Sequence, residues 1–575
     1  MCNPRERSKG IPSACYIATT EADKTNLFAS HFLSVFNHEP PPSCEVINRV
    51  LDSVPADLLN LNAFEVSNDD ILNASKRLKM SYTPGPDGIP SVVLKRCINE
   101  LLTPLASIIN RSLLSGVFPS KWKHSYLFPI FKKGSRNNVK NYRGITSLCS
   151  SSKLIELIMH EYLFFHCKQY LSFDQHGFYP GRSVTTNLLQ FTTSCLKVIE
   201  NHSQVDVVYT DLKAAFDRID KDLFLLKLSK LGASEHLVRW IQSYLCGRTL
   251  QVKIGVQVSR TFSNPSGVPQ GSTLGPLFFA LYINDLCSVL PEGCRLIYAD
   301  DVKIYRKVAN SEDCYQLQQW INVFSDWCHW NRLDISIDKC SVISFTRKVS
   351  AIVHDYTLND RSLSRVAVVK DLGVLLDSKL NFNAHRLAII DKANRQLGFV
   401  KKVASEFTDP LCLRSLYCSL VRPILESSSV VWIPFTNIWI DRIEQIQKRF
   451  VRFALVRLPW RDALNLPPYA ERCRLLGIDT LAKRRKIDQA VFAGKVLKAE
   501  IDCPDILSQF SLNVPQRRLR EREFFRQSFH RSSYGRFGPL ASIRNTFNSV
   551  DHLFNVLDSA EVFKSKLKLC RNFDV

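Results

Sequence analysis

Length, composition and charge bound what this chain can be. Its 575 residues exceed a single domain, and a content of 45% hydrophobic and 10% aromatic residues excludes an intrinsically disordered chain. The 76 lysines and arginines against 54 aspartates and glutamates give a charge of +22, which favours a polyanionic partner such as nucleic acid, although basic proteins without such a partner also exist.

Cysteine spacing and apolar runs exclude further classes. The 18 cysteines are scattered and none forms a C-x-x-C pair, so we expect reduced thiols and neither a zinc site nor a disulfide framework. The N-terminus lacks the apolar segment of a signal peptide. The longest apolar stretch, residues 276–283, is far shorter than the roughly 18–20 residues that span a bilayer. The expectation is an intracellular protein, cytoplasmic and/or nuclear, without a membrane segment.

The first 150 residues predict an extension followed by mixed elements. A short helix is expected over residues 25–36, and the proline-rich break at 39–43 marks residues 1–60 as an N-terminal extension or linker. A helix should begin at residues 67–70, where side-chain oxygens can cap free N–H groups. A rigid turn at 83–88 precedes a helical pattern through Leu114, and residues 118–147 alternate extended runs with basic turns.

The middle of the chain predicts strands that end in acidic residues. A strand over 205–209 ends at Asp211, and a helix follows from about Asp220 through Leu231. Residues 296–305 predict two short strands joined by a tight acidic turn. Further along, we expect a helix over 277–286, a helix over 320–333 and an extended segment over 335–345.

After about residue 385 the pattern becomes mostly helical. Ile443, Ile446, Phe450 and Phe453 recur at helical spacing. Residues 517–537 differ, because seven arginines interleave there with aromatic residues. This segment either follows a phosphate backbone with its rings stacked on bases, or buries its aromatic rings in a helical core. Strands and helices in mixed order predict an α+β fold.

Three carboxylates are candidates for chemistry: Asp211 at a strand end, and Asp300 with Asp301 at a hairpin tip. If the two strands are neighbours, these carboxylates converge and repel one another. Two Mg²⁺ ions, or Mn²⁺ in their place, would remove that repulsion and hold a triphosphate for phosphoryl transfer. An Asp–Asp pair alone is weak evidence, because the pair at residues 69–70 is interpreted as a helix start.

The surrounding motifs resemble those of LINE-type (non-LTR) retrotransposon reverse transcriptases. YADD at residues 298–301 is similar to the Y-x-D-D box of that family, and YTDLKAAFD at 209–217 to its first palm motif. SGVPQGSTLGP at 266–276 resembles the motif between them. Further similar blocks stand in the family's order, so the resemblance covers roughly residues 20–570: TPGPDGI at 83–89, PIFKKGSRNNVKNYRGITSL at 129–148, QHGFYPGRSVTTN at 175–187, residues 327–345, and DLGVLLDSKLNF at 371–382. The segment at 417–432 looks most like the jockey lineage.

The resemblance implies a right-hand polymerase with fingers, palm and a mostly helical thumb. It places the fingers at residues 61–200, the palm at 201–385 and the thumb with the C-terminal region at 386–575. The implied activity is RNA-directed DNA polymerisation, with an RNA template, a DNA primer and deoxynucleoside triphosphates as partners. Asp211, Asp300 and Asp301 are the implied metal ligands and catalytic residues.

The resemblance also implies nucleotide-binding residues. Phe216 stands where the family has an aromatic gate against a ribose 2′-hydroxyl, and a core residue at a helix start is the alternative. Gln270 lies in a loop that can approach the nucleotide or simply form a turn. Lys339 matches a motif thought to protonate pyrophosphate, and a surface lysine is the alternative. Lys132, Lys133 and Arg143 match a triphosphate-binding block that can also be a solvated loop.

Other residues are expected to contact nucleic acid or to cap helices. The segment 371–382 with Gly373 resembles a primer-grip hairpin, and Arg517, Arg518 and Arg526 are candidates for phosphate contacts. Asp217 and Asp220 fit a helix N-terminus better than a metal site. The sequence departs from the common family pattern at Ala214, Tyr179 and Gly144, none of which removes a carboxylate.

Three functions stay open at this point. The first is an active reverse transcriptase, the second a catalytically inactive relic that binds RNA or an RNA–DNA hybrid, and the third a domesticated telomerase-like or maturase-like enzyme. Only about 60 residues precede Val66, fewer than the endonuclease domain usual in such elements requires. The expectation is therefore an element shortened at its 5′ side.

Overall fold

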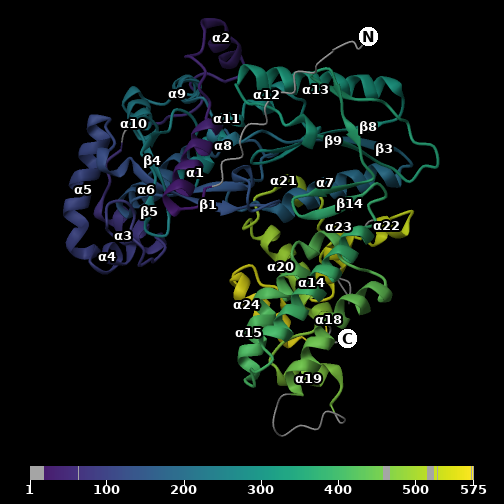
Figure 1. The fold of residues 1–575 in the computed structure, drawn as a ribbon. Helices are drawn as coiled ribbons and strands as arrows, with labels where there is room; N and C mark the ends of the chain where they lie inside the picture. The colour runs from purple at the N-terminus through teal and green to yellow at the C-terminus, as the bar shows by residue number, and fades with distance from the viewer. Residues whose placement is uncertain are drawn as a thin grey trace, which may run out of the picture. The chain divides into compact units, whose positions relative to one another are not determined.

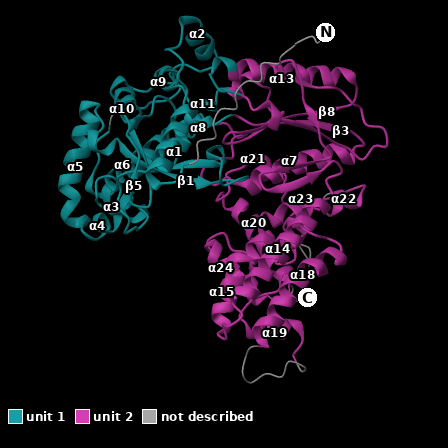
Figure 2. Ribbon diagram, in the orientation of Figure 1, with its two compact units in different colours: residues 1–170, 213–285, 329–334 teal, residues 171–212, 286–328, 335–575 magenta. Residues whose placement is uncertain are grey.

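The computed structural model describes residues 18–62, 64–456, 466–513, 523–527, 529–570 and 573. The chain divides into two compact units, and each is assembled from separate stretches of sequence (Figure 2). The first unit comprises residues 1–170, 213–285 and 329–334, and the second comprises 171–212, 286–328 and 335–575. The fold is of the mixed α/β kind, with helices and strands in both units (Figure 1).

In the first unit, helices surround a small sheet of strand order β2-β1-β4-β5, with β6 paired to β4. Phe28 and Phe32 of the first helix pack on this sheet against Leu127 and Val252. The strands are β1 His124–Phe131, β2 Tyr142–Ser147, β4 Thr249–Ile254, β5 Gln257–Val258 and β6 Phe262–Ser263. The helices are α1 Glu21–Val35, α2 Cys44–Asp52, α3 Asn68–Arg77, α4 Ser91–Arg96, α5 Ile98–Ser115, α6 Ser150–Cys167, α8 Ala215–Arg218, α9 Lys221–Lys230, α10 Glu235–Leu245 and α11 Leu274–Ile283.

The second unit contains the other large sheet, of strand order β12-β9-β3-β8-β7. Helices α7 and α13 lie on opposite sides of this sheet (Figure 1). Its strands are β3 Gln204–Thr210, β7 Arg295–Tyr298, β8 Asp301–Val308, β9 Ser341–Phe345 and β12 Ser364–Arg365, and two hairpins follow, β10 Thr357–Leu358 with β11 Arg361–Ser362 and β13 Val368–Asp371 with β14 Val374–Asp377.

Most helices of the second unit, from α14 onward, share one large core with α7, whereas α12 and α13 contribute no residue to it. Ile443, Ile446 and Phe450 are fully buried there, as their helical spacing predicts. The helices of the second unit are α7 Val184–Glu200, α12 Leu286–Val289, α13 Ser311–Trp330, α14 Asn383–Val403, α15 Pro410–Leu420, α16 Arg422–Glu426, α17 Ser429–Trp432, α18 Asn437–Leu455, α19 Tyr469–Leu475, α20 Leu481–Leu497, α21 Pro504–Leu507, α22 Ser533–Arg536, α23 Pro539–Asn548 and α24 Ala560–Leu569.

Most predicted elements are confirmed, and several bounds need correction. Helix α3 begins where expected, with a capping box between Ser67 and Asp70. The helix predicted over 320–333 starts earlier, at Ser311, because Glu312 and Asp313 supply an acidic first turn. The extended segment predicted over 335–345 is a strand only from Ser341, since Ile337–Lys339 form a 3₁₀ turn. The helix predicted over 277–286 is α11, which ends at Ile283.

No helix among the described residues is long and apolar enough to cross a membrane. The cysteines that the structure describes are free thiols, as their spacing predicts.

Candidate active site

The register between β3 and β8 brings the predicted carboxylates together. The last ladder pair is Thr210 with Val302, so the next positions, Asp211 and Asp301, stand opposite each other. Directly opposed residues of an antiparallel pair have Cα atoms about 4.5–5.5 Å apart. Asp300 precedes Asp301 at the tip of the β7–β8 hairpin. The strand that precedes the acidic pair, β7, was expected beside β3, but β8, which begins at Asp301, lies between them and pairs with both.

The electrostatics of this strand end are those of like charges held close together. Burial, together with the negative charges of Asp300 and Asp211, raises the pKa of Asp301 to about 6. The Lys339 ammonium donates a hydrogen bond of 2.7 Å to Asp211 Oδ2, so the structure joins these two predicted residues. Asp211 thus has a cationic partner, whereas the ionised form of Asp301 is destabilised by burial and by its acidic neighbours.

A divalent cation fits the chemistry of this donor set. Carboxylate oxygens are the ligands that Mg²⁺ and Mn²⁺ prefer, and a cation relieves their mutual repulsion. Within the described part of the chain, no three acidic, histidine or cysteine side chains are already arranged around one point.

The turn that carries Asp300 is strained and is held from outside the hairpin. Ala299 has a φ of 58°, a conformation that non-glycine residues seldom adopt. The side-chain oxygen of Gln175 accepts hydrogen bonds from the backbone N–H groups of Ala299, at 3.0 Å, and Gly177, at 2.8 Å. A Cβ atom at Gly177 would lie 2.4 Å from the Ala299 nitrogen, so only glycine permits this approach. The block at 175–187 thus positions the acidic turn.

A buried charge network lies beside the same strand end. The Lys303 ammonium contacts Asp371 Oδ2 at 2.6 Å and donates to Asn187 Oδ1 at 2.7 Å. The Tyr209 hydroxyl donates to the same Asp371 oxygen at 3.0 Å. This network joins β8, α7 and β3 to the hairpin of β13 and β14. A hairpin was expected over residues 371–382, but the structure forms it earlier, between Val368–Asp371 and Val374–Asp377, with Gly373 in its turn at a φ of +94°.

Sequence reasoning gave no role to Gln175, Gly177 or Lys303. A glycine beside polar residues signals a close backbone approach, so Gly177 could have been suspected. Lys303 follows the acidic pair in a strand, where a buried lysine requires an opposite charge. That signal points to a partner but does not identify Asp371.

The first unit gathers a second set of predicted residues around Asp217. The Gln270 amide donates to Asp217 Oδ2 at 2.6 Å, and the Gln270 carbonyl accepts from the Thr146 N–H at 2.7 Å. The pKa of Asp217 is raised to about 6, because burial outweighs the opposing effects of the Gln270 hydrogen bond and the charge of Arg143. Gln270 and Arg143 are therefore close to one carboxylate, although Arg143 itself is exposed.

The other predicted residues of the first unit have simpler surroundings. Phe216 is half-buried and its ring stacks on Phe279 with centroids 4.5 Å apart, so packing accounts for part of its role. Lys132 and Lys133 are exposed just after β1. Asp220 caps α9 by accepting from two backbone N–H groups at 3.0 Å, which confirms its expected helix role.

The arginine-rich segment is described only in part. Arg526 is exposed, while Arg517 and Arg518 lie outside the described residues. Phe525 is fully buried and belongs to the core, as one of the two interpretations of this segment requires.

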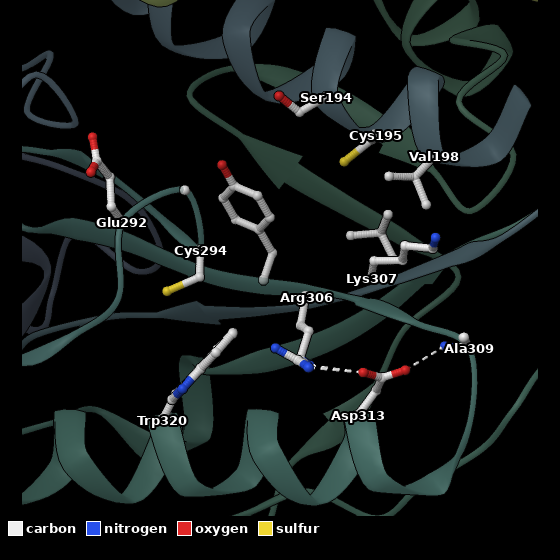
Figure 3. Close-up of a pocket in the computed structure, with 13 residues that line it drawn as sticks. Ser194, Cys195, Val198, Glu292, Cys294, Arg306, Lys307, Ala309, Asp313 and Trp320 are labelled. Carbon is white, nitrogen blue, oxygen red and sulfur yellow. Dashed lines mark hydrogen bonds and ion pairs between the residues drawn. The ribbon is translucent and has the colours of Figure 1, made fainter. Parts of the chain in front are cut away.

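A cavity of about 470 Å³ in the second unit is distinct from the acidic turn (Figure 3). Its walls come from α7, α13 and the far ends of β3 and β8, with Cys195, Lys307 and Trp320 among the lining residues. Arg306 in its wall donates to Asp313 at 2.9 Å. None of the three candidate carboxylates lines it, so the strand end is a separate site.

Comparison with known proteins places these features in a family. Residues 130–376 match the model described as reverse transcriptase (RNA-dependent DNA polymerase). A probable RNA-directed DNA polymerase from transposon BS of Drosophila melanogaster is 27% identical over 466 residues, covering 78% of this chain and 51% of the relative. The RNA-directed DNA polymerase from mobile element jockey of the same species is 27% identical, with 77% and 49% covered.

A jockey polymerase from Drosophila funebris is 28% identical over 384 residues, which cover 64% of this chain and 41% of the relative. The chain thus spans about half the length of the first two relatives. The matched region contains Asp211, Asp300 and Asp301 and the elements that position them. The chain therefore carries a reverse transcriptase domain and is homologous to the polymerases of jockey, BS and other non-LTR retrotransposons.

Proposed function

We propose that this chain is an RNA-directed DNA polymerase that extends a DNA primer 3′-hydroxyl on an RNA template with deoxynucleoside triphosphates. The observation that carries the proposal is the register that sets Asp211 opposite Asp301 and next to Asp300, inside a reverse transcriptase domain. The net charge of +22 supports a nucleic-acid partner. The chemistry needs convergent carboxylates on stiff elements, which two paired strands provide.

We assign the parts of a right-hand polymerase along the chain. Residues 61–200 are proposed as fingers, 201–385 as palm and 386–575 as thumb, after an extension at 1–60. The mainly helical content after residue 385 and the sheet that carries the acidic turn support this division.

The proposed catalytic residues would hold two divalent cations, Mg²⁺ or Mn²⁺, through the carboxylates of Asp211, Asp300 and Asp301. Such cations supply charge stabilisation and a more acidic primer hydroxyl. Gln175 and Gly177 keep the acidic turn in place, so they are positioning residues. Lys339 neutralises Asp211 and is proposed to donate a proton to the leaving pyrophosphate, because its ammonium is half-exposed beside that carboxylate.

The first unit is proposed to contact the incoming nucleotide. Arg143, Lys132 and Lys133 are exposed cations suited to a triphosphate. Gln270 is fixed by Asp217 and is proposed to lie against the base or sugar. Phe216 is proposed to exclude a ribose 2′-hydroxyl, since its stacking on Phe279 makes the ring rigid.

Primer extension tests the proposal directly. Wild-type protein with a primed RNA template, Mg²⁺ and the four deoxynucleotides should extend the primer, and Asp300→Asn should reduce incorporation by about 10⁴-fold, because a metal clamp contributes several kcal/mol. Asp69→Asn is the matched control, since it alters the other Asp–Asp pair at the exposed start of α3. Equal incorporation by wild type and Asp300→Asn would refute the assignment. Salt-sensitive RNA binding without incorporation in Mg²⁺ or Mn²⁺ would identify an inactive relic.

A further inference from the structure

A second cavity in the second unit, of about 240 Å³, combines aromatic rings with arginines. It is smaller than the roughly 300–1,000 Å³ of drug-sized ligand pockets, so it suits a single planar group. The walls come from the start of α14, the α17–α18 connection, α22 and the segment after β9, and the residues that matter here are Arg347, Arg386, Phe435, Trp439, Tyr534 and Phe537.

Arg386 gives this cavity a buried positive charge without a carboxylate partner. Its side chain is 3% exposed, and its guanidinium donates only to oxygens of amides and carbonyls, at 3.0–3.3 Å. Its Nε has no hydrogen-bond partner among the described residues. Burial lowers the pKa of Arg386 to about 10, although the charge of Asp377 opposes the shift. A buried cation of this kind favours an anion in the cavity it lines.

The aromatic residues offer flat surfaces beside that charge. Phe435 and Phe537 are stacked, with centroids 5.0 Å apart and ring planes within 2°, yet their side chains are 45% and 42% exposed. The guanidinium of Arg347 lies 4.1 Å from the centre of the Tyr534 ring. Stacked rings that are left half-exposed next to arginines are the surfaces on which nucleobases stack.

We propose that this cavity binds one nucleotide of single-stranded nucleic acid, with the base against the rings of Phe435, Phe537 and Trp439 and the phosphate facing Arg347 and Arg386. The positive charge excludes cationic ligands such as quaternary ammonium groups. An acidic peptide would satisfy the arginines but would leave the stacked rings uncovered. The inference deepens the proposed function and rests on it for the choice of nucleic acid as the polyanion.

The cavity also explains part of the arginine-rich segment at 517–537. Phe525 at its centre is buried in the core, whereas Tyr534 and Phe537 near its end line the cavity. The two interpretations of this segment therefore apply to different residues within it.

Binding without polymerisation tests the proposal. The affinity of the full chain for a fluorescein-labelled single-stranded RNA 12-mer is measured by fluorescence anisotropy, in EDTA and without nucleotides. A second measurement uses single-stranded DNA of the same sequence. Phe435→Ala/Phe537→Ala should weaken binding by about tenfold or more, in the range of base–aromatic stacking. Phe537→Tyr, which keeps the ring, should bind like wild type. Phe399→Ala, which removes another exposed ring of the same unit, should change nothing.

The phosphate contact is tested by charge-matched variants. Arg347→Gln should weaken binding and reduce the slope of log affinity against log salt by about 0.7, the value for one phosphate of a single strand. Arg361→Gln removes an exposed arginine elsewhere in the unit and should have a smaller effect on affinity. A 5-iodouridine RNA should cross-link to the peptides that contain Phe435 to Trp439 or Tyr534 to Phe537.

Three results would overturn the proposal. These are equal binding by the double phenylalanine variant and wild type, cross-links confined to other peptides, or full competition by a glutamate 12-mer with no effect of the phenylalanine changes. The Asp300→Asn variant should still bind RNA in EDTA, which separates the proposed cavity from the proposed polymerase activity. Failure of the wild-type protein to incorporate nucleotides, with intact cavity binding, would count only against the polymerase assignment.

Discussion

A buried lysine–aspartate pair is present among the described residues of each unit, and the two pairs have similar surroundings. Lys227 in α9 contacts both Asp285 oxygens at 2.8 and 2.9 Å and donates to Asn331 Oδ1 at 2.6 Å. Lys303 in β8 contacts Asp371 at 2.6 Å and Asn187 Oδ1 at 2.7 Å. An aromatic ring lies near each ammonium, Tyr282 at 4.4 Å and Phe191 at 4.8 Å.

The pairs differ in what they connect. Lys227 joins α9 to the end of α11 and the segment after it, through Tyr282 and Asp285, and to Asn331. Lys303 stands two residues after Asp301 and ties the hairpin with Gly373 to the strand that precedes Asp211. The same electrostatic device thus stabilises the fold in one unit and aligns proposed catalytic elements in the other. The burial and the ion pairing are alike in both cases. The structural and the positioning role are distinguished by which helices and strands each lysine connects.

Breaking the Lys303 pair should have the largest combined effect. Lys303→Met leaves the Asp371 carboxylate buried and unpaired, which should lower the free energy of unfolding by about 3–5 kcal/mol. Primer extension per folded molecule should fall by about 100-fold, because misplacement of the strand end disturbs the carboxylates. Urea denaturation gives the first quantity, and extension rates at saturating nucleotide give the second.

A double variant separates positioning from stability at this pair. Lys303→Met/Asp371→Asn removes the orphaned charge and keeps an acceptor for the Tyr209 hydroxyl, so most of the stability should return. The extension rate should stay low, since the hairpin has lost its ionic link to β8. Full recovery of both quantities would reduce the network to a structural role.

Breaking the Lys227 pair should cost stability alone. Lys227→Met leaves the buried Asp285 carboxylate without its cationic partner. Among the described side chains, the Ser53 hydroxyl at 3.0 Å then remains as its hydrogen-bond donor. The free energy of unfolding should fall by about 3–5 kcal/mol. The rate of primer extension per folded molecule should remain within about twofold of wild type, because the activation free energy ΔG‡ should change little. Active-site titration gives the concentration of folded enzyme for this comparison. A loss as large as that of Lys303→Met would show that the two pairs have the same role.

Local patterns sufficed to predict the strands that carry the carboxylates. The apolar run before Asp211 and the turn at Asp300 mark β3, β7 and β8 from neighbouring residues alone. Ser67 and Asp70 likewise announce α3. The predicted bounds of an element were wrong where a tertiary contact sets the local conformation. At residues 335–340, for example, the Ser336 N–H donates to the Asp211 carbonyl at 2.7 Å.

The partners of the site could not be predicted from local patterns. Gln175 and Ala299 are 124 positions apart, and nothing near either residue encodes the other. The division of the chain into two units could not be predicted either, because each unit is assembled from stretches that are far apart in the sequence. Family motifs identified the carboxylates, but the network around Lys303 became visible only when β8, α7 and β13 were brought together.

The smallest expected effect concerns a buried group that lacks an opposite charge. His176 is 1% exposed and its ring bonds to Thr186 Oγ1 at 2.8 Å and Gln190 Oε1 at 3.0 Å. Burial, with the positive charges of Arg182 and Lys303, lowers its pKa to about 3, although the Gln190 hydrogen bond opposes the shift. Unlike the two lysines, this histidine stays neutral in the folded state.

The pH dependence of stability follows from that neutrality. Below the unfolded-state pKa of about 6.5, the unfolded chain binds a proton that the folded chain excludes, so the stability present above pH 6.5 is lost as pH falls. His176 should contribute about 2 kcal/mol of lost stability between pH 7 and pH 5. In urea denaturation, His176→Gln should flatten the pH dependence by that amount, while replacement of the exposed His236 should leave it as in wild type. An unchanged slope in His176→Gln would mean that His176 accepts a proton in the folded state and does not account for the loss of stability at low pH.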